Sequence, residues 1–214
     1  LKLQTNSQGN FFLPLENTLL SGSSYVNCGF YTEPEMLLLK DLGFEVRPRE
    51  FIGTTVWSQG RADALVRREI KSGFFAYSER NGVYDVSRAS VLPLTTGTHV
   101  MGSYNEILQN SSVIASGAGS AGVRIDGSGN VFTLDKNADF VENGYDSAGV
   151  AVVYGHGNSV NLKGNVQAEG SGGIGVFLGF GSNLHSDLKE YRGSYLRVCD
   201  GKDAPLPKEL SGAL

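Results

Sequence analysis

Four asparagines recur at nearly regular intervals in the second half of the chain. They are separated by 25, 28 and 25 residues: Asn105, Asn130, Asn158 and Asn183. The motif SAGV also occurs twice, at 120–123 and at 147–150. Sequence periods of 20 to 50 residues are typical of solenoids, in which one structural unit is stacked on the next. This repeat constrains the fold more strongly than any other feature of the sequence.

Short apolar segments alternate with turn-forming residues inside each repeat. In chain order they are EIL, VIA, VRI, FTL, DFV, VAV, VNL, VQA and IGVFL. Three such strands per repeat predict a mainly β chain containing a right-handed parallel β-helix with coils of about 25 residues over 95–185. An antiparallel barrel or sandwich is the alternative, although a fixed repeat in the sequence is less expected there.

Equivalent residues of successive coils are expected to lie above one another. The valines that follow the repeated glycine should form one inward-facing column: Val123, Val150 and Val176. The glycines before them are expected at tight corners or close backbone contacts: Gly122, Gly149 and Gly175. Three of the asparagines suit left-handed turn positions where their amides form ladders: Asn130, Asn158 and Asn183.

The first part of the chain has a different pattern. Thr32 is a candidate helix N-cap, with Pro34 in the first turn and Glu35 three residues after the cap. Apolar residues come next, and Gly43 stands where such a helix should end. We therefore expect one short helix within a small mixed α/β region.

The segment 51–94 carries mixed signals. ADALVRREIKSG is compatible with a short helix ended by Gly73, and Asn81-Gly82 between aromatic runs predicts a hairpin over about 74–86. The predicted organisation is the C-terminal part of a protease-like domain with one helix (1–50), a transitional region with a hairpin (51–94), the β-helix (95–185), and a cap or linker tail (186–214).

Composition excludes several classes of protein. The chain has 214 residues, 29 glycines but only 6 prolines, and a net charge of −4. Seven acidic and three basic residues lie within 95–183, so the repeats offer no basic patch for nucleic acid. No apolar run approaches the roughly 20 residues that span a bilayer. The two cysteines, Cys28 and Cys199, suit neither a disulfide scaffold nor a four-ligand zinc site, although they could pair if the two ends meet.

The repeats resemble a known class of secreted protein. The runs TGTHVMGSYNEILQNSSVIASGAGSAGVRIDGSGN, GVAVVYGHGNSVNLKGNVQAEGSGGIGVFLGFGSN and EYRGSYLR, within 95–197, are similar to the glycine-rich β-helical passengers of Gram-negative autotransporters (type V secretion). This resemblance covers about half of the chain. It implies a secreted or outer-membrane-linked surface protein, such as an adhesin associated with virulence.

A second resemblance concerns 13–46. The segment LENTLLSGSSYVNCGFYTEPEMLLLKDLGFEV is similar to the last part of a metzincin metalloprotease domain, where a methionine-containing turn precedes a closing helix. The zinc-binding His-Glu-x-x-His motif of that family is absent, and Leu20 stands where the family has methionine. The resemblance therefore carries over no catalytic residue.

The candidate chemical groups do not form a recognisable motif. The three histidines lack metal-ligand spacing and are expected on surface turns: His99, His156 and His185. Clustered carboxylates would suit a polysaccharide-cleaving β-helix, but the acids lie on different predicted strands and suggest a solvated acidic face: Asp126, Asp135, Asp139, Glu142 and Asp146. No nucleophile elbow, phosphate loop or calcium-binding nonapeptide is present.

Aromatic residues recur near the turns of the repeat. They suit either an exposed ligand-binding ladder or a stacked interior: Tyr145, Tyr154, Phe177 and Phe180. The sequence thus predicts no catalytic residue, metal ligand or cofactor, and it names no binding residue.

The sequence leaves two classes of function open. The first is an extracellular or bacterial cell-surface passenger fragment that acts as a β-helical stalk or adhesin scaffold. Its partners would be a host or neighbouring-cell protein or glycan, and further modules of the same parent protein. The alternative is part of a secreted metalloprotease or a polysaccharide-acting enzyme. We expect the parent gene to continue in both directions, with a signal and protease-like domain upstream and more β-helix or an outer-membrane barrel downstream.

Overall fold

A computed structural model describes residues 31–76, 92–153 and 157–178 of the chain. It also defines the backbone of six short strands: β1 (Gln4–Thr5), β2 (Phe11–Phe12), β3 (Tyr25–Val26), β7 (Glu79–Arg80), β8 (Val83–Tyr84) and β19 (Ser182–Asn183). β1 pairs with β2, β7 with β8, and β19 with β3, each pair antiparallel.

The predicted helix is confirmed. α1 (Glu33–Asp41) begins after Thr32, whose side chain and that of Glu35 form a reciprocal capping box. Gly43 lies just after the helix with a φ of 93°, a left-handed conformation that glycine adopts without strain. A second, shorter helix, α2 (Pro48–Phe51), starts at a proline and leads directly into the first strand of the sheets.

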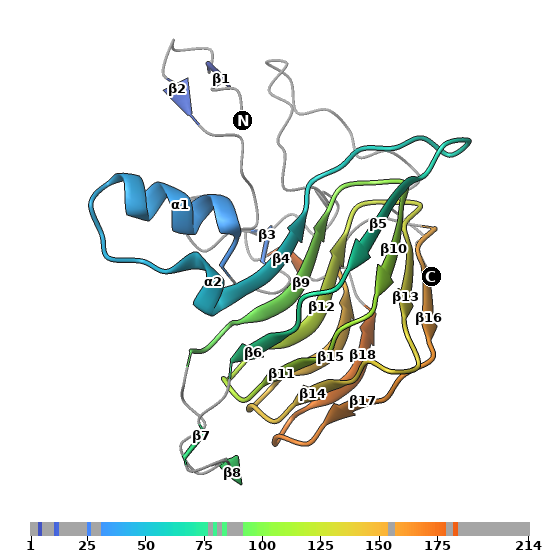
Figure 1. Ribbon diagram of the computed structural model, residues 1–214. Helices are drawn as coiled ribbons and strands as arrows, with labels where there is room; N and C mark the ends of the chain where they lie inside the picture. The colour runs from blue at the N-terminus through green and yellow to red at the C-terminus, as the bar shows by residue number, and fades with distance from the viewer. Residues whose placement is uncertain are drawn as a thin grey trace.

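The chain after α2 builds three parallel sheets of five, four and four strands, and each sheet grows in chain order (Figure 1). The first sheet consists of β4 (Ile52–Val56), β9 (Thr96–Met101), β12 (Ala121–Asp126), β15 (Ala148–Val152) and β18 (Ile174–Leu178). The second consists of β5 (Val66–Ile70), β10 (Asn105–Gln109), β13 (Val131–Leu134) and β16 (Ser159–Leu162). The third consists of β6 (Phe74–Ala76), β11 (Val113–Ala115), β14 (Phe140–Glu142) and β17 (Val166–Ala168).

Each passage of the chain through the three sheets adds one strand to each of them, and we call such a set of three strands a rung. The pairing keeps one register throughout, so that Val123 lies beside Val150 and Val150 beside Val176. Thr98 and Thr54 continue this column in β9 and β4. The register of the predicted valine column is confirmed, with Val123 and Val150 buried and Val176, at its end, 43% exposed. The chain is mainly β with parallel strands in stacked sheets, an arrangement compatible with a β-helix.

The core lies between the three sheets. Strands of the second and third sheets alternate buried and less buried residues, as expected when one face is covered. Phe132 and Phe140 meet inside, with ring centroids 6.2 Å apart. Val123, Ile125 and Val150 are fully buried in the same cluster.

The repeated glycines allow the first and third sheets to approach each other. A Cβ atom on Gly122 would lie 2.5 Å from the carbonyl oxygen of Gly149 and 2.8 Å from Cγ of Phe140. A Cβ atom on Gly149 would lie 2.2 Å from Val166. The expected close packing is thus confirmed at these two positions, whereas no described residue lies within 4 Å of the equivalent point at Gly175.

The asparagine ladder is present, but the expected left-handed conformation is not found at Asn130 or Asn158. Oδ1 of Asn130 accepts hydrogen bonds from the backbone and side-chain nitrogens of Asn105 at 3.0 and 2.9 Å, and Oδ1 of Asn158 accepts one from the backbone of Asn130 at 3.0 Å. The residue before each of these asparagines has the positive φ instead: Tyr104, Gly129 and Gly157. The turn is completed one residue earlier, so the asparagine lies where the next strand starts.

The segment 51–94 differs from the prediction. Val66–Ile70 is β5, so a helix does not form in ADALVRREIKSG, because parallel pairing with β10 determines its conformation. Phe74–Ala76 pairs with β11, and the hairpin is confined to β7 and β8. The first rung is therefore β4, β5 and β6, upstream of the predicted start at Thr95.

The two ends of the stack are unlike. β5 carries Arg67, Arg68 and Glu69, charges of the kind that protect a sheet edge. At the other end β16, β17 and β18 contain no charged residue, and Ile174, Val176 and Leu178 are 43–47% exposed. Within the described part of the chain, no helix is long and apolar enough to cross a membrane.

Candidate functional site

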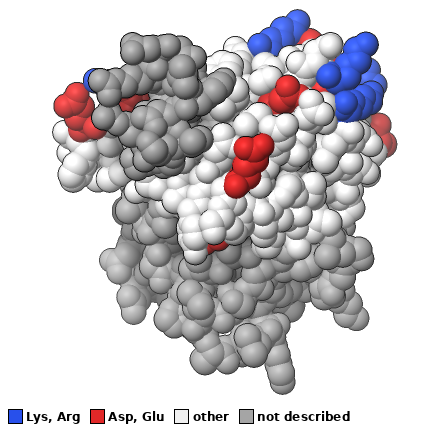
Figure 2. All heavy atoms as spheres, turned by 90° about the horizontal axis from the view of Figure 1, so that it is seen from below, with Lys and Arg blue, Asp and Glu red and all other residues white. Residues whose placement is uncertain are grey.

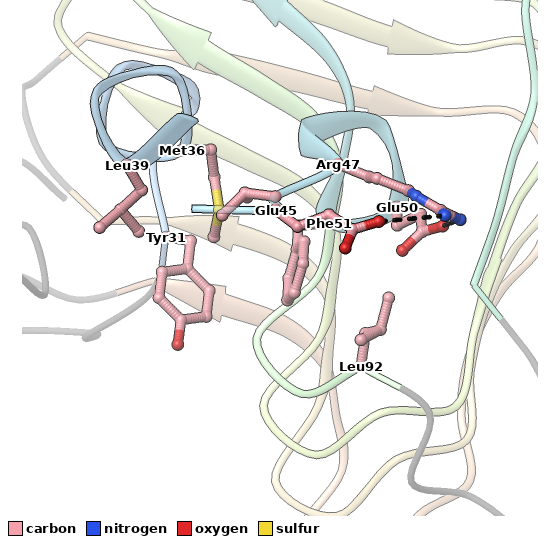
Figure 3. A pocket seen from close by; sticks show the side chains of 9 residues that line it. Tyr31, Met36, Leu39, Glu45, Arg47, Glu50, Phe51 and Leu92 are labelled. Carbon is pink, nitrogen blue, oxygen red and sulfur yellow. Dashed lines mark hydrogen bonds and ion pairs between the residues drawn. The ribbon is translucent and has the colours of Figure 1, made fainter. Parts of the chain in front are cut away.

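A cavity lies between α1 and α2, beside the first rung (Figure 3). Its volume is about 430 Å³. Six apolar or aromatic side chains line it: Tyr31, Met36, Leu39, Val46, Phe51 and Leu92. Three charged residues complete the lining: Glu45, Arg47 and Glu50. The combination of apolar walls and a few polar groups is typical of binding pockets.

Local structure holds the walls of this cavity in place. The capping box at Thr32 fixes the start of α1, and Met36 on that helix is only 2% exposed. The rings of Tyr31 and Phe51 pack edge to face with centroids 5.3 Å apart. An ion pair between Arg49 and Glu33 joins α2 to α1.

The charged groups of the cavity form one small network. Arg47 donates a hydrogen bond of 3.1 Å to Glu50 and lies 3.8 Å from Glu45, between the two carboxylates (Figure 3). Two carboxylates thus share one guanidinium, which leaves the cavity with a net negative charge. These side chains are largely exposed, so water and ions screen their charges, but a ligand can reach them.

The sequence did not indicate this cavity. It predicted α1 but neither α2 nor the contact between Tyr31 and Phe51, which comes from tertiary structure. One local signal was present: Pro48 lies between Arg47 and Glu50, which is the pattern of a proline in the first turn of a helix.

His99 belongs to a second polar cluster, on the outer face of the first sheet. The prediction of a surface turn is wrong for this residue: it lies in β9, is fully buried, and its Nε2 is 2.8 Å from the carboxylate of Asp126. Arg124 donates to the same carboxylate at 3.0 Å. His99 and Arg124 are adjacent in the parallel register, which places all three groups together.

Burial and charge act differently on the members of this cluster. Burial lowers the pKa of His99 more than the hydrogen bond and charge of Asp126 raise it, which favours a neutral imidazole. Burial alone would raise the pKa of Asp126, but the charge of Arg124 and the hydrogen bond from His99 hold it below its usual value. The central interaction is therefore an Asp126–Arg124 ion pair. Arg124 also borders a smaller hollow of about 150 Å³.

Glu142 is a buried carboxyl group at the end of β14. Ser120 donates a hydrogen bond of 2.6 Å to its Oε2, and within the described structure Oε1 has no hydrogen-bond partner. Burial raises the pKa of Glu142 well above its usual value, and the hydrogen bond from Ser120 offsets only part of this rise. The predicted solvated acidic face is therefore wrong for Glu142 and for Asp126, which is also buried.

The remaining predicted residues are dispersed. Asp135 and Asp139 are partly exposed, and each accepts hydrogen bonds from an asparagine rather than facing another carboxylate. Asp146 is exposed in the turn before β15. Tyr145 is 61% exposed, whereas Phe177 is partly buried against the outer face of the first sheet.

Several residues singled out from the sequence lie outside the described residues. They are the two cysteines, two histidines and two aromatic residues: Cys28, Cys199, His156, His185, Tyr154 and Phe180. Asn183 is described only by its backbone in β19. The expectations for these side chains therefore stay predictions.

Among the described residues, no group of three or more His, Cys, Asp or Glu side chains is arranged to hold a metal ion.

Comparisons of the chain with protein-family models, curated proteins and solved structures find no match. Function is therefore inferred from the stacked sheets, the cavity and the buried polar clusters.

Proposed function

We propose that the stacked sheets form a right-handed parallel β-helix and that this β-helix serves as a stalk or scaffold in a surface-exposed autotransporter passenger. The observation that supports this best is the unbroken column from Thr54 through Thr98, Val123 and Val150 to Val176. Such a column allows a fold to grow by repetition, because each rung contacts only its neighbours. A stalk needs this property, since its length is set by the number of rungs.

The surface supports a role in contact rather than catalysis. The outward positions of the third sheet form an uncharged row of Phe75, Ile114, Val141 and Gln167 in consecutive strands. Seen from below the view of Figure 1, the described surface is mostly uncharged, with few acidic groups and the basic groups near the margins (Figure 2). An uncharged β face suits contact with a protein or glycan.

The enzymatic alternative is less well supported. A polysaccharide-cleaving site needs two carboxyl groups on one accessible face. Asp126 is engaged by Arg124 and His99, and Glu142 is fully buried. In the proposed passenger, α1 would be the closing helix of the preceding protease-like region.

Cell-surface display is the experiment that tests this function. Antibodies raised against the 214-residue chain are applied to intact cells of the source bacterium, before and after treatment with an external protease. The proposal predicts labelling of intact cells that the protease removes. Labelling that appears only after the cells are permeabilised would contradict a surface passenger.

A further inference from the structure

We propose that the cavity between α1 and α2 binds a segment of a partner protein in which an apolar side chain stands next to a positively charged one. This site is separate from the uncharged face of the third sheet and does not depend on the stalk function. Three observations carry the proposal: the shape of the cavity, its charge, and the surface around it.

The cavity has the size and lining for an apolar side chain. Its volume of about 430 Å³ falls within the range of roughly 300–1,000 Å³ found for ligand pockets. Met36, Leu39 and Phe51 form walls from both helices, and Leu92 completes the lining (Figure 3). An aromatic or aliphatic group would replace water against these surfaces, which is favourable.

The cavity is formed before any partner arrives. Tyr31 and Phe51 already pack against each other, and the Arg49–Glu33 ion pair joins the two helices. A site whose walls are fixed in advance loses less conformational entropy on binding than one that must be assembled.

The charge of the cavity favours a positively charged residue next to the apolar side chain of the partner segment. Glu45 and Glu50 both approach Arg47, so one carboxylate charge is not balanced within the network. A lysine or arginine of the partner would meet this excess negative charge, whereas an aspartate or glutamate would be repelled by two carboxylates. The rings of Tyr31 and Phe51 add surfaces that attract cations.

The surroundings indicate a protein rather than a small molecule. Four large apolar residues on α1 and the turn after it are exposed: Leu37 (46%), Leu38 (38%), Leu42 (66%) and Phe44 (60%). A small ligand in the cavity would leave these residues in water. Apolar groups gathered on one short segment are typical of a contact surface between proteins.

The two methionines of the chain give a direct assay. Met36 lines the cavity, whereas Met101 is 8% exposed in a separate cluster on the first sheet. With ¹³C-methyl methionine labelling, each reports its own surroundings by NMR. The probes are three capped dipeptide amides: acetyl-Phe-Lys-amide, acetyl-Phe-Glu-amide and acetyl-Ala-Lys-amide.

We expect acetyl-Phe-Lys-amide to shift the Met36 methyl signal in a saturable way and to leave Met101 unchanged. The Phe-Glu and Ala-Lys peptides should bind several-fold more weakly, since each lacks one of the two features. Glu45→Gln should weaken binding of the Phe-Lys peptide about two- to five-fold, as expected for one exposed charge pair. Leu39→Trp, which fills the cavity, should abolish the shift, whereas Lys40→Trp, at an exposed position of α1 outside the cavity lining, should leave the shift in place.

Three results with the unsubstituted chain, and one with a variant, would overturn the proposal. The first three are a Met36 signal that no peptide moves, equal shifts of Met36 and Met101, and equal affinities for the Phe-Lys and Phe-Glu peptides. Unchanged binding by the Leu39→Trp variant would also overturn it, provided that the Met101 signal shows that the variant is folded.

Discussion

Glu142 makes the stability of the folded chain depend on pH. Its folded-state pKa is raised by burial, so between its unfolded pKa of about 4.3 and the higher folded value the folded state binds more protons than the unfolded state. The contribution of Glu142 to the free energy of unfolding therefore falls as pH rises through this window. Above the folded pKa, the buried carboxylate is charged and its cost is fully present.

Replacing Glu142 with glutamine should remove this penalty. We expect Glu142→Gln to raise the free energy of unfolding by about 1–3 kcal/mol at pH 8, the order of magnitude for relieving a poorly satisfied buried polar group. The gain should shrink toward pH 5. Urea unfolding at both pH values measures it, with the exposed Glu169→Gln as the control, for which a change within about 0.5 kcal/mol is expected. A destabilised Glu142→Gln protein at pH 8 would contradict a costly buried charge.

Arg124 should be essential for the buried cluster on the first sheet. Arg124→Met keeps much of the side-chain volume but leaves the Asp126 carboxylate without its cationic partner, beside His99, whose pKa burial lowers. We expect a loss of about 3–5 kcal/mol in the free energy of unfolding, the usual result of removing one partner of a buried ion pair.

A double-mutant cycle separates charge from packing at this cluster. Asp126→Asn in the Arg124→Met background removes the unpaired charge and should recover part of the loss. Additive losses from the two substitutions would show that the residues do not act as a pair.

Single residues of the polar clusters were the hardest features to predict. His99, Asp126 and Glu142 are polar and stand near glycine-rich turns, so their sequence context suggests a surface. The structure shows that they are buried instead. The parallel register places His99 beside Arg124, and Glu142 accepts a hydrogen bond from Ser120. These polar groups are buried because the fold brings their partners close: Asp126 meets His99 of the preceding rung, and Glu142 meets Ser120, 22 residues away in sequence. A single sequence does not show those partners.

At the scale of the elements, we expect that the first sheet can pack against the third only if glycine occupies position 122. Gly122→Ala would place a Cβ atom within 3 Å of Gly149 and Phe140. We expect it to lower the free energy of unfolding by about 1–3 kcal/mol, as overpacking usually does.

Gly175 is the matched control for this effect, since it has the equivalent position in β18 and no atom of the described part of the chain lies within 4 Å of an added Cβ. Gly175→Ala should change stability by less than about 0.5 kcal/mol. If Gly122→Ala and Gly175→Ala changed the free energy of unfolding equally in thermal or urea unfolding, the close approach of the sheets would not be what requires glycine at position 122.

Strand prediction succeeded where the repeat is regular and failed where it is not. The apolar segments recognised in the sequence, from EIL to IGVFL, correspond one to one to the strands of the three sheets from β10 to β18. β5 was missed because its sequence VRREI is charged and has no repeat partner in the sequence. Its strand conformation comes from pairing with β10.

At the scale of the whole molecule, stability should decrease toward β18. Among the described residues, this strand has a partner on one side only, in β15, and its apolar residues are exposed. β12 lies between β9 and β15 and contains fully buried residues. Amide hydrogen exchange followed by mass spectrometry should therefore show at least about tenfold faster exchange in β18 than in β12, since edge elements open locally. Equal protection of the two strands would contradict an open edge at β18.

The column through the valines can also be tested by substitution. Val150 is fully buried and Val176 is 43% exposed at the end of the same column. Val150→Asp should cost several kcal/mol because it buries an unpaired carboxylate, whereas Val176→Asp should cost less than about 1 kcal/mol. A Val150→Asp protein within about 0.5 kcal/mol of the parent in urea unfolding would refute the inward assignment.

The most direct test of the stacked parallel sheets is a methyl–methyl NOE measurement on valine-labelled protein. Neighbouring strands are about 4.8 Å apart, so Val150 should show NOEs to both Val123 and Val176. Val123 and Val176 are two strand spacings apart and should show no direct NOE to each other. Absence of both Val150 contacts, or NOEs that pair these strands in antiparallel order, would contradict the stacked parallel arrangement.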